Sequence, residues 1–245
     1  HHASQIEWLA ADADPRPLKV WLKIDTGMHR LGFAPADAAQ AYRRLHALQN
    51  VDADIGLMTH FANSDVAEDE QTRIQMQRFE QVVAKLSGAR SLANSAGVLE
   101  WPQSRAPWVR PGGLLYGISV IAGSHAAQFG LRPAMTLASK LVAINRVGKG
   151  EAVGYAGDWI CPEDMDIGVV QIGYGHVYPR SAPSGTPVLL NGRRAQIVGR
   201  VSMDLISIDL RGQADARVLD PVLLWGEALP VEEIDATVGK FSYAR

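Results

Sequence analysis

The first half of the chain alternates short apolar runs with longer segments of helical periodicity. The apolar runs at 20–24 and 55–59 are nearly continuous, as is typical of parallel strands buried on both faces. Apolar residues recur at helical spacing over 35–49 and 76–86, and the second helix is expected to end at Gly88 as its C-cap. This alternation predicts βα units and therefore an α/β fold for this half.

After about residue 122 the pattern changes to short strands separated by turns. The Asn191-Gly192 pair lies between apolar runs and predicts a tight hairpin, because both residues tolerate positive φ. We therefore expect two domains, an α/β domain over 1–122 and an all-β, β-rich domain over 123–245. The expected strands of the second domain are 135–144, 167–172, 188–190, 195–198, 205–210 and 222–225.

Composition narrows the classes of protein to which the chain can belong. Its 245 residues are 47% hydrophobic, which is enough to build a substantial core. A formal net charge of -2, with no basic stripe, gives no support to a nucleic-acid partner. No apolar run approaches the roughly 20 residues that a membrane-spanning helix needs. The single cysteine, Cys161, excludes an internal disulfide framework, and we expect a cytoplasmic protein.

Polar side chains follow the successive predicted strands of the first half. Lys23 lies at the end of one strand with Arg30 beyond it, His60 follows the next, and Ser95 and Arg110 come later. In a βα barrel the C-terminal strand ends meet at one mouth, so we expect these groups to share a site. On the residues alone, other interpretations stay open: a paired core lysine for Lys23, a satisfied core histidine for His60 and a surface arginine for Arg30.

Two further patterns suggest anion binding and proton transfer. Ser95 opens a possible helix and Gly112-Gly113 follow Arg110, so backbone N–H groups could approach an anion closely. A simple Pro-Gly-Gly turn is the alternative. In the β half, Tyr155 and Tyr174 lie beside glycines. A tyrosine acts as a base only if its pKa, ordinarily about 10, is lowered, and plain hydrophobic packing is the alternative.

Taken together, the motifs resemble bacterial alanine racemase in order and spacing over essentially the whole chain. The resemblance implies a fold-type III enzyme that uses pyridoxal 5'-phosphate to interconvert L-alanine and D-alanine, the latter for peptidoglycan. It also implies the C-terminal half of a (β/α)8 TIM barrel, then a β-rich domain, in a homodimer with active sites shared between subunits. The matching segments are 20–32, 58–62, 94–96, 108–112, 115–117, 153–155 and 199–204.

The resemblance also implies a role for individual residues. Tyr155 matches the base for the L-alanine face, donated to the other subunit's site, and Met203 and Arg30 match substrate-binding residues. Lys23 matches a position that is carbamylated in some members, and Tyr174 lies on the substrate-access loop. No metal site is assigned. The residues that match cofactor-binding positions are His60, Ser95, Arg110, Gly112, Gly113 and Tyr243.

The chain departs from the family pattern at two places. None of its six lysines lies in the motif that carries the cofactor lysine, so we expect a partial chain that lacks the N-terminal portion and is inactive alone. His176-Val177 stands where the family has Asp-Gly, which bears on the access loop. Two alternatives therefore stay open. One is a broad-specificity amino-acid racemase, and the other is a non-catalytic binding or oligomerisation module.

Overall fold

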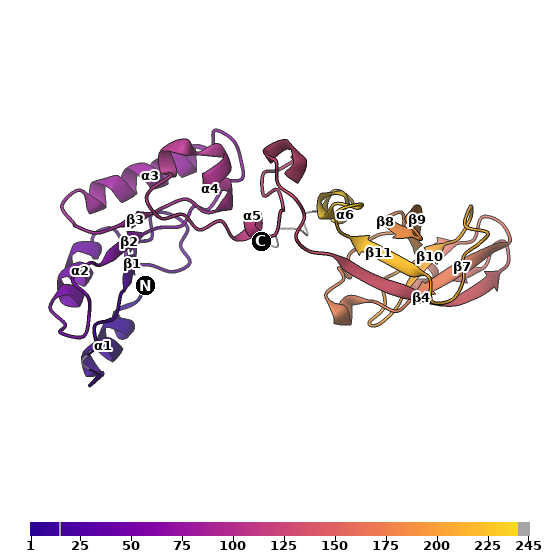
Figure 1. Ribbon diagram of the computed structural model, residues 1–245, viewed down its shortest axis with the longest axis horizontal. Coiled ribbons are helices and arrows are strands. Elements are labelled where there is room, and N and C mark those ends of the chain that lie inside the picture. The colour runs from indigo at the N-terminus through magenta and orange to yellow at the C-terminus, as the bar shows by residue number, and fades with distance from the viewer. Residues whose placement is uncertain (15, 240–245) are drawn as a thin grey trace. The chain divides into compact units, whose positions relative to one another are not determined.

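The chain folds into two compact units in a computed structural model that describes residues 1–14 and 16–239 (Figure 1). The first unit contains 1–114 and 120–124, and the second contains 115–119 and the chain from His125 onward. None of the described helices combines the length and the apolar character that crossing a bilayer requires.

The first unit is built on a parallel sheet of order β1-β2-β3. Its strands are β1 (Trp21–Lys23), β2 (Gly56–Met58) and β3 (Arg90–Ser91), and a parallel bridge between Asn94 and Arg110 continues the sheet. The helices are α1 (Ala3–Ala11), α2 (Ala38–His46), α3 (Glu70–Val83), α4 (Ser95–Glu100) and α5 (Gly112–Leu115). The expected alternation of strands and helices is confirmed for this unit.

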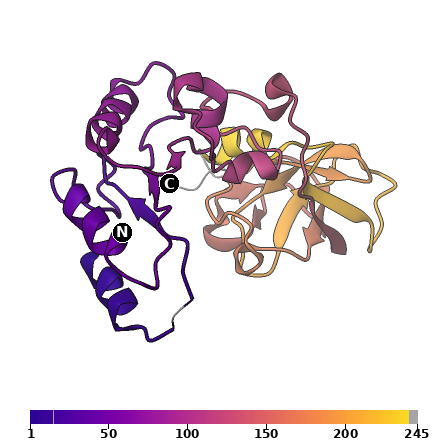
Figure 2. The same cartoon turned by 60° about the vertical axis from the view of Figure 1, so that its left-hand side comes forward.

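Helices α2 and α3 cover one face of this sheet, as both views show (Figures 1 and 2). Leu45 of α2 and Phe79 of α3 are buried in one cluster with Leu22 and Leu57 of the strands. The predicted C-cap at Gly88 is wrong, because α3 ends at Val83. Gly88 instead has φ +132° and packs so tightly that a Cβ there would lie 1.9 Å from the Ile55 carbonyl oxygen.

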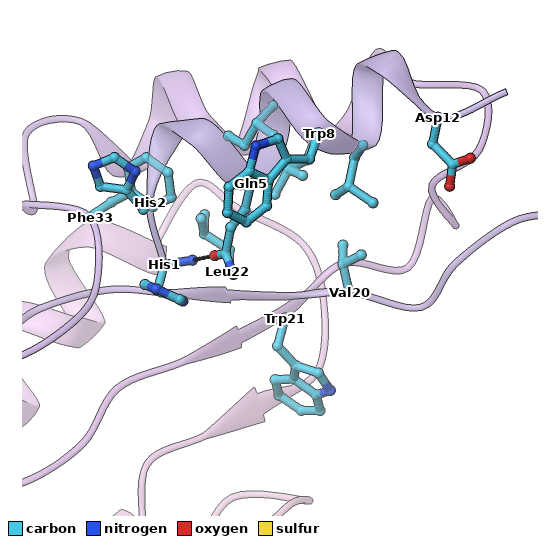
Figure 3. Close-up of a pocket in the computed structure, with 12 residues that line it drawn as sticks. His1, His2, Gln5, Trp8, Asp12, Val20, Trp21, Leu22 and Phe33 are labelled. Carbon is cyan, nitrogen blue, oxygen red and sulfur yellow. Dashed lines mark hydrogen bonds between the residues drawn. The ribbon is translucent and has the colours of Figure 1, made fainter. Parts of the chain in front are cut away.

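A cavity of about 430 Å³ lies between α1 and β1. Figure 3 shows Trp21 pointing away from α1, on the other side of the strand from Leu22. Alternation of side chains along a strand explains this arrangement. β1 pairs with β2, and no described strand pairs with its other edge.

The second unit is a closed antiparallel barrel of strand order β10-β7-β4-β11-β8-β9. Closure leaves no unpaired edge, and apolar side chains such as Leu141, Ile197 and Ile208 fill the interior. The expected strands are confirmed, with ends shifted by a few residues. They are β4 (Leu137–Val147), β7 (Met165–Val170), β8 (Pro187–Leu190), β9 (Arg193–Val198), β10 (Ile206–Asp209) and β11 (Pro221–Trp225).

The predicted hairpin turn joins β8 to β9, with φ of 51° at Asn191 and 77° at Gly192. Two elements went unpredicted. One is the small hairpin of β5 (Ala152–Val153) and β6 (Trp159–Ile160), and the other is helix α6 (Val231–Val238). A strictly all-β second half is therefore wrong, because α6 packs its Ile234 into the barrel core.

Candidate functional site

The strand ends of the first unit bring positively charged groups together around His60. Burial lowers the pKa of His60 to about 4, and the charges of Arg110, Arg30 and Lys23 act in the same direction. Burial also lowers the pKa of Lys23, with added effects from Arg30 and Arg110. His60 is therefore neutral at pH 7, and no ion pair of Lys23 occurs among the described residues.

Arg110 is fixed by hydrogen bonds from both terminal nitrogens of its guanidinium. Its Nη1 donates to the Ser91 carbonyl at 3.0 Å and to Ser91 Oγ at 2.5 Å. Its Nη2 donates to the Thr59 carbonyl and, at 3.4 Å, to the Leu92 carbonyl. Within the described part of the chain, the Nε–H has no acceptor. The guanidinium is thus held rigidly with one donor left for a ligand.

The helix α4 and the glycine turn after Arg110 meet at Ser95. Asn94 caps α4 by accepting from the Gly97 N–H at 2.9 Å, and Ser95 Oγ accepts from the Gly113 N–H at 2.9 Å. A Cβ at Gly113 would lie 2.7 Å from Val120 Cγ1, whereas one at Gly112 would meet nothing within 4 Å. A side chain at 113 would therefore have to displace Val120, whereas the space at 112 is open.

Asp25 shapes the turn that carries Arg30. Its Oδ1 accepts from the N–H groups of Gly27, Met28 and His29 at 2.9, 3.0 and 3.1 Å. Burial raises the pKa of the Asp25 carboxyl, but these three donors outweigh it and the net shift is downward. The turn leaves the Arg30 side chain exposed, as the surface interpretation expects.

The second unit has its own cavity, of about 820 Å³, which gathers the other predicted residues. Tyr155, Tyr174 and Met203 all line it, and their exposed fractions are 71%, 41% and 57%. Such exposure excludes core packing as the reason for Tyr155. Arg180 lies over the Tyr174 ring, 5.2 Å from its centroid, and Arg200 pairs with Asp158 at the same cavity.

The unusual His176-Val177 pair does not remove Tyr174 from this cavity. The Gly175 N–H donates to the Met203 carbonyl at 2.8 Å, which holds the loop around Tyr174 against the Met203 turn. Val177 has φ +69°, a value at which a β-branched residue is strained. His176 Nδ1 lies 3.8 Å from Asp204 Oδ1.

The predicted site residues thus fall into two groups, one on each unit. Lys23, His60 and Arg110 interact in the first unit, where Ser95 also contacts Gly113. Tyr243 lies outside the described residues. Thr59, Ser91 and Arg180 were not among the predicted site residues. Thr59 and Ser91 contact Arg110 from distant segments, and Arg180 contacts Tyr174 six residues away, so short sequence patterns gave no signal for them.

An α/β unit with cationic strand ends, joined to a β-barrel unit with exposed tyrosines, defines the class: a two-domain amino-acid racemase, which is an isomerase. Residues 1–120 match the family described as "Alanine racemase, N-terminal domain" and 134–245 match "Alanine racemase, C-terminal domain". The chain belongs to the alanine racemase family.

Individual relatives agree with this assignment. The alanine racemase of Shewanella sp. (strain MR-7) is 52% identical over 243 residues, covering 99% of this chain and 68% of the relative. The crystal structure of biosynthetic alanine racemase from Pseudomonas aeruginosa is 44% identical with a TM-score of 0.92, covering 99% of this chain and 67% of that one. The Bartonella henselae alanine racemase, described with covalently bound pyridoxal phosphate, shares the fold at 23% identity and a TM-score of 0.78, covering 98% and 66% of the two chains.

Proposed function

We propose that this protein interconverts L-alanine and D-alanine with pyridoxal 5'-phosphate bound at the strand ends of its first unit, and that it supplies D-alanine for peptidoglycan. The parallel sheet with helices on one face is consistent with the second half of a (β/α)8 barrel. The observation that carries the proposal is the half-buried cluster of His60, Lys23 and Arg110, in which the guanidinium keeps one N–H for a ligand.

The donor set of the first unit fits this cofactor. A pyridine nitrogen needs a donor, and Arg110 Nε–H offers one from a guanidinium whose other nitrogens are already fixed. An aromatic ring can stack on the flat imidazole of His60, which is neutral at pH 7. A phosphate needs N–H and O–H donors. The Ser95 oxygen accepts from the Gly113 N–H, so its own hydroxyl hydrogen is available, and the open space at Gly112 lets an anion approach. The resemblance adds Tyr243 as a phosphate ligand.

Arg110 determines how strongly the bound cofactor can draw electrons. When bound, the cofactor withdraws electrons from the substrate Cα and so makes its proton acidic. Arg110 is donor-only and remains protonated despite the lowering of its pKa by burial, so a pyridine nitrogen placed against it would stay unprotonated. Arg110 would thereby weaken electron withdrawal from the substrate, and a proton would have to return promptly to Cα. Prompt return favours racemisation over transamination.

Tyr155 is proposed as the group that moves the proton on the L-alanine face. Its hydroxyl is exposed and has no hydrogen-bond partner among the described residues. Placed beside the cationic groups of a second copy's first unit, the phenol would become more acidic and able to act as a base. Homodimerisation would thus complete the site, with Met203 arriving on the same cavity wall. Arg30 would orient the substrate.

Lys23 is proposed to be carbamylated. Its pKa is lowered by burial and by Arg30 and Arg110, so more of its amine is neutral and able to react with carbon dioxide. The product would replace a cation by an anion. That anion could pair with Arg30 and hold it toward the substrate.

The test is D-alanine formation from L-alanine by a completed protein, made by placing before residue 1 the part of the Shewanella relative that this chain does not cover. We expect turnover with added cofactor, and a folded, cofactor-loaded protein without turnover would overturn the proposal. The 245-residue chain alone is the control and should form no D-alanine, because it lacks the cofactor lysine. Turnover of several amino acids at similar rates would favour the broad-specificity alternative.

A further inference from the structure

Gln75 is a fully buried glutamine on helix α3, and its side-chain amide is hydrogen-bonded at both ends. Its Nε2 donates to the His60 carbonyl at 3.0 Å and to Thr26 Oγ1 at 3.3 Å, and its Oε1 accepts from the Ala62 N–H at 2.9 Å. Burial of an amide is costly unless its polar atoms find partners. One side chain therefore hydrogen-bonds to the turn after β2 at two points and links it to the turn after β1.

The hydrogen bonds continue from Gln75 to Arg110. The hydroxyls of Thr26 and Thr59 lie 2.7 Å apart, and both residues are buried. The Thr59 carbonyl then accepts from Arg110 Nη2. A chain of buried polar contacts thus joins α3, the two strand ends and the guanidinium, and such networks hold their members in one arrangement.

Two other side chains of α3 also reach the first turn, but they do not reach the second. Gln71 Nε2 donates to the Gly27 carbonyl at 3.2 Å and Arg78 Nη1 donates to the Thr26 carbonyl at 3.1 Å. Both contacts keep the β1 turn on the helix. Among the described residues of α3, Gln75 alone hydrogen-bonds to the segment 60–62, so the polar contacts that place the His60 turn on this helix depend on it.

We propose that Gln75 is a positioning residue that fixes the His60 turn against the end of β1 and so holds His60 and Arg110 in place for the cofactor. The role in cofactor binding rests on the proposed function. The positioning itself does not, because it concerns groups of this chain alone.

The test is the pH titration of the His60 ring by NMR in the full chain, without cofactor or substrate, with the signal assigned by its loss in His60→Asn. Gln75→Met removes all three hydrogen bonds at similar volume, and Gln77→Met makes the same change at an exposed position of the same helix. In Gln75→Met we expect the pKa of His60 to rise from about 4 toward 6.5 as the turn loosens and water reaches the ring. Gln77→Met should leave it near 4.

Unfolding in urea, measured on the same samples, separates positioning from general stability. A folded Gln75→Met protein that is less stable but keeps the His60 pKa near 4 would overturn the proposal. If Gln75→Met does not fold, Gln75→Asn carries the test, because it keeps an uncharged amide on a shorter side chain that cannot reach all three partners. It should give a His60 pKa between those of the wild type and 6.5. A value unchanged from the wild type would again contradict the proposal.

Discussion

Replacing Tyr155 by Phe should slow proton abstraction from the substrate without changing the stability of the fold. The Tyr155 side chain is 71% exposed and its hydroxyl has no partner among the described residues, so removing one oxygen should change the free energy of unfolding by less than about 0.5 kcal/mol. A proton-transfer group contributes roughly 10²- to 10⁴-fold to a rate. We therefore expect Tyr155→Phe in the completed protein to slow abstraction from L-alanine by about that factor, while abstraction from D-alanine changes little.

The assay is the loss of α-deuterium from each enantiomer of alanine, followed separately in single-turnover experiments. Urea unfolding of the same variant tests the stability side. Ala182→Ser, which changes a buried small residue near the same cavity without touching the tyrosine, serves as a control. Equal slowing for both enantiomers would refute a face-specific role and would leave Tyr155 as a surface contact.

Three further predictions concern the first unit and the Tyr155 turn. Because the folded pKa of His60 is about 4 against an ordinary 6.5, the unfolded chain binds more protons between these values, so stability should fall as pH drops from 6.5 to 4. Urea unfolding should give a lower free energy of unfolding at pH 5 than at pH 7, and His60→Asn should make this difference smaller. A difference that is the same in His60→Asn as in the wild type would contradict the burial of this ring. Ala156→Gly should raise the free energy of unfolding by about 1 kcal/mol, because Ala156 has φ +63°, and a lower urea midpoint would contradict the strain. In 13C-labelled bicarbonate, NMR should show a carbamate signal that Lys23→Arg abolishes; a signal that survives would assign it to another amine.

The sequence predicted the strands of both units because burial imposes simple patterns on them. Continuous apolar runs mark β1 and β2, and Asn191-Gly192 marks the β8–β9 hairpin through its positive φ. Helix α6 was not predicted. It is only eight residues long, and its Ile234 is buried by packing on the barrel. Tertiary packing, which no short window contains, decides such a segment.

The residues of the candidate site also divide into those that the sequence predicts and those that only the fold reveals. Strand-end positions made Lys23, His60 and Arg110 predictable, since parallel strands deliver their ends to one edge. Gln75 was not predictable, because a glutamine in an amphipathic helix gives no sign that it faces the core. Its role follows from three partners in segments distant from α3 in sequence. Arg180 likewise acquires significance only from the fold of the loop around Tyr174.

The central claim is that each active site combines the cationic cluster of one chain with Tyr155 of a second copy. Complementation tests it directly: completed protein carrying Tyr155→Phe is mixed under subunit exchange with completed protein carrying Arg110→Met. In a mixed dimer one site carries both defects and the other carries neither, so random mixing should restore about a quarter of wild-type activity. Mixed dimers that form but show no more activity than the two parents would contradict a site shared between subunits.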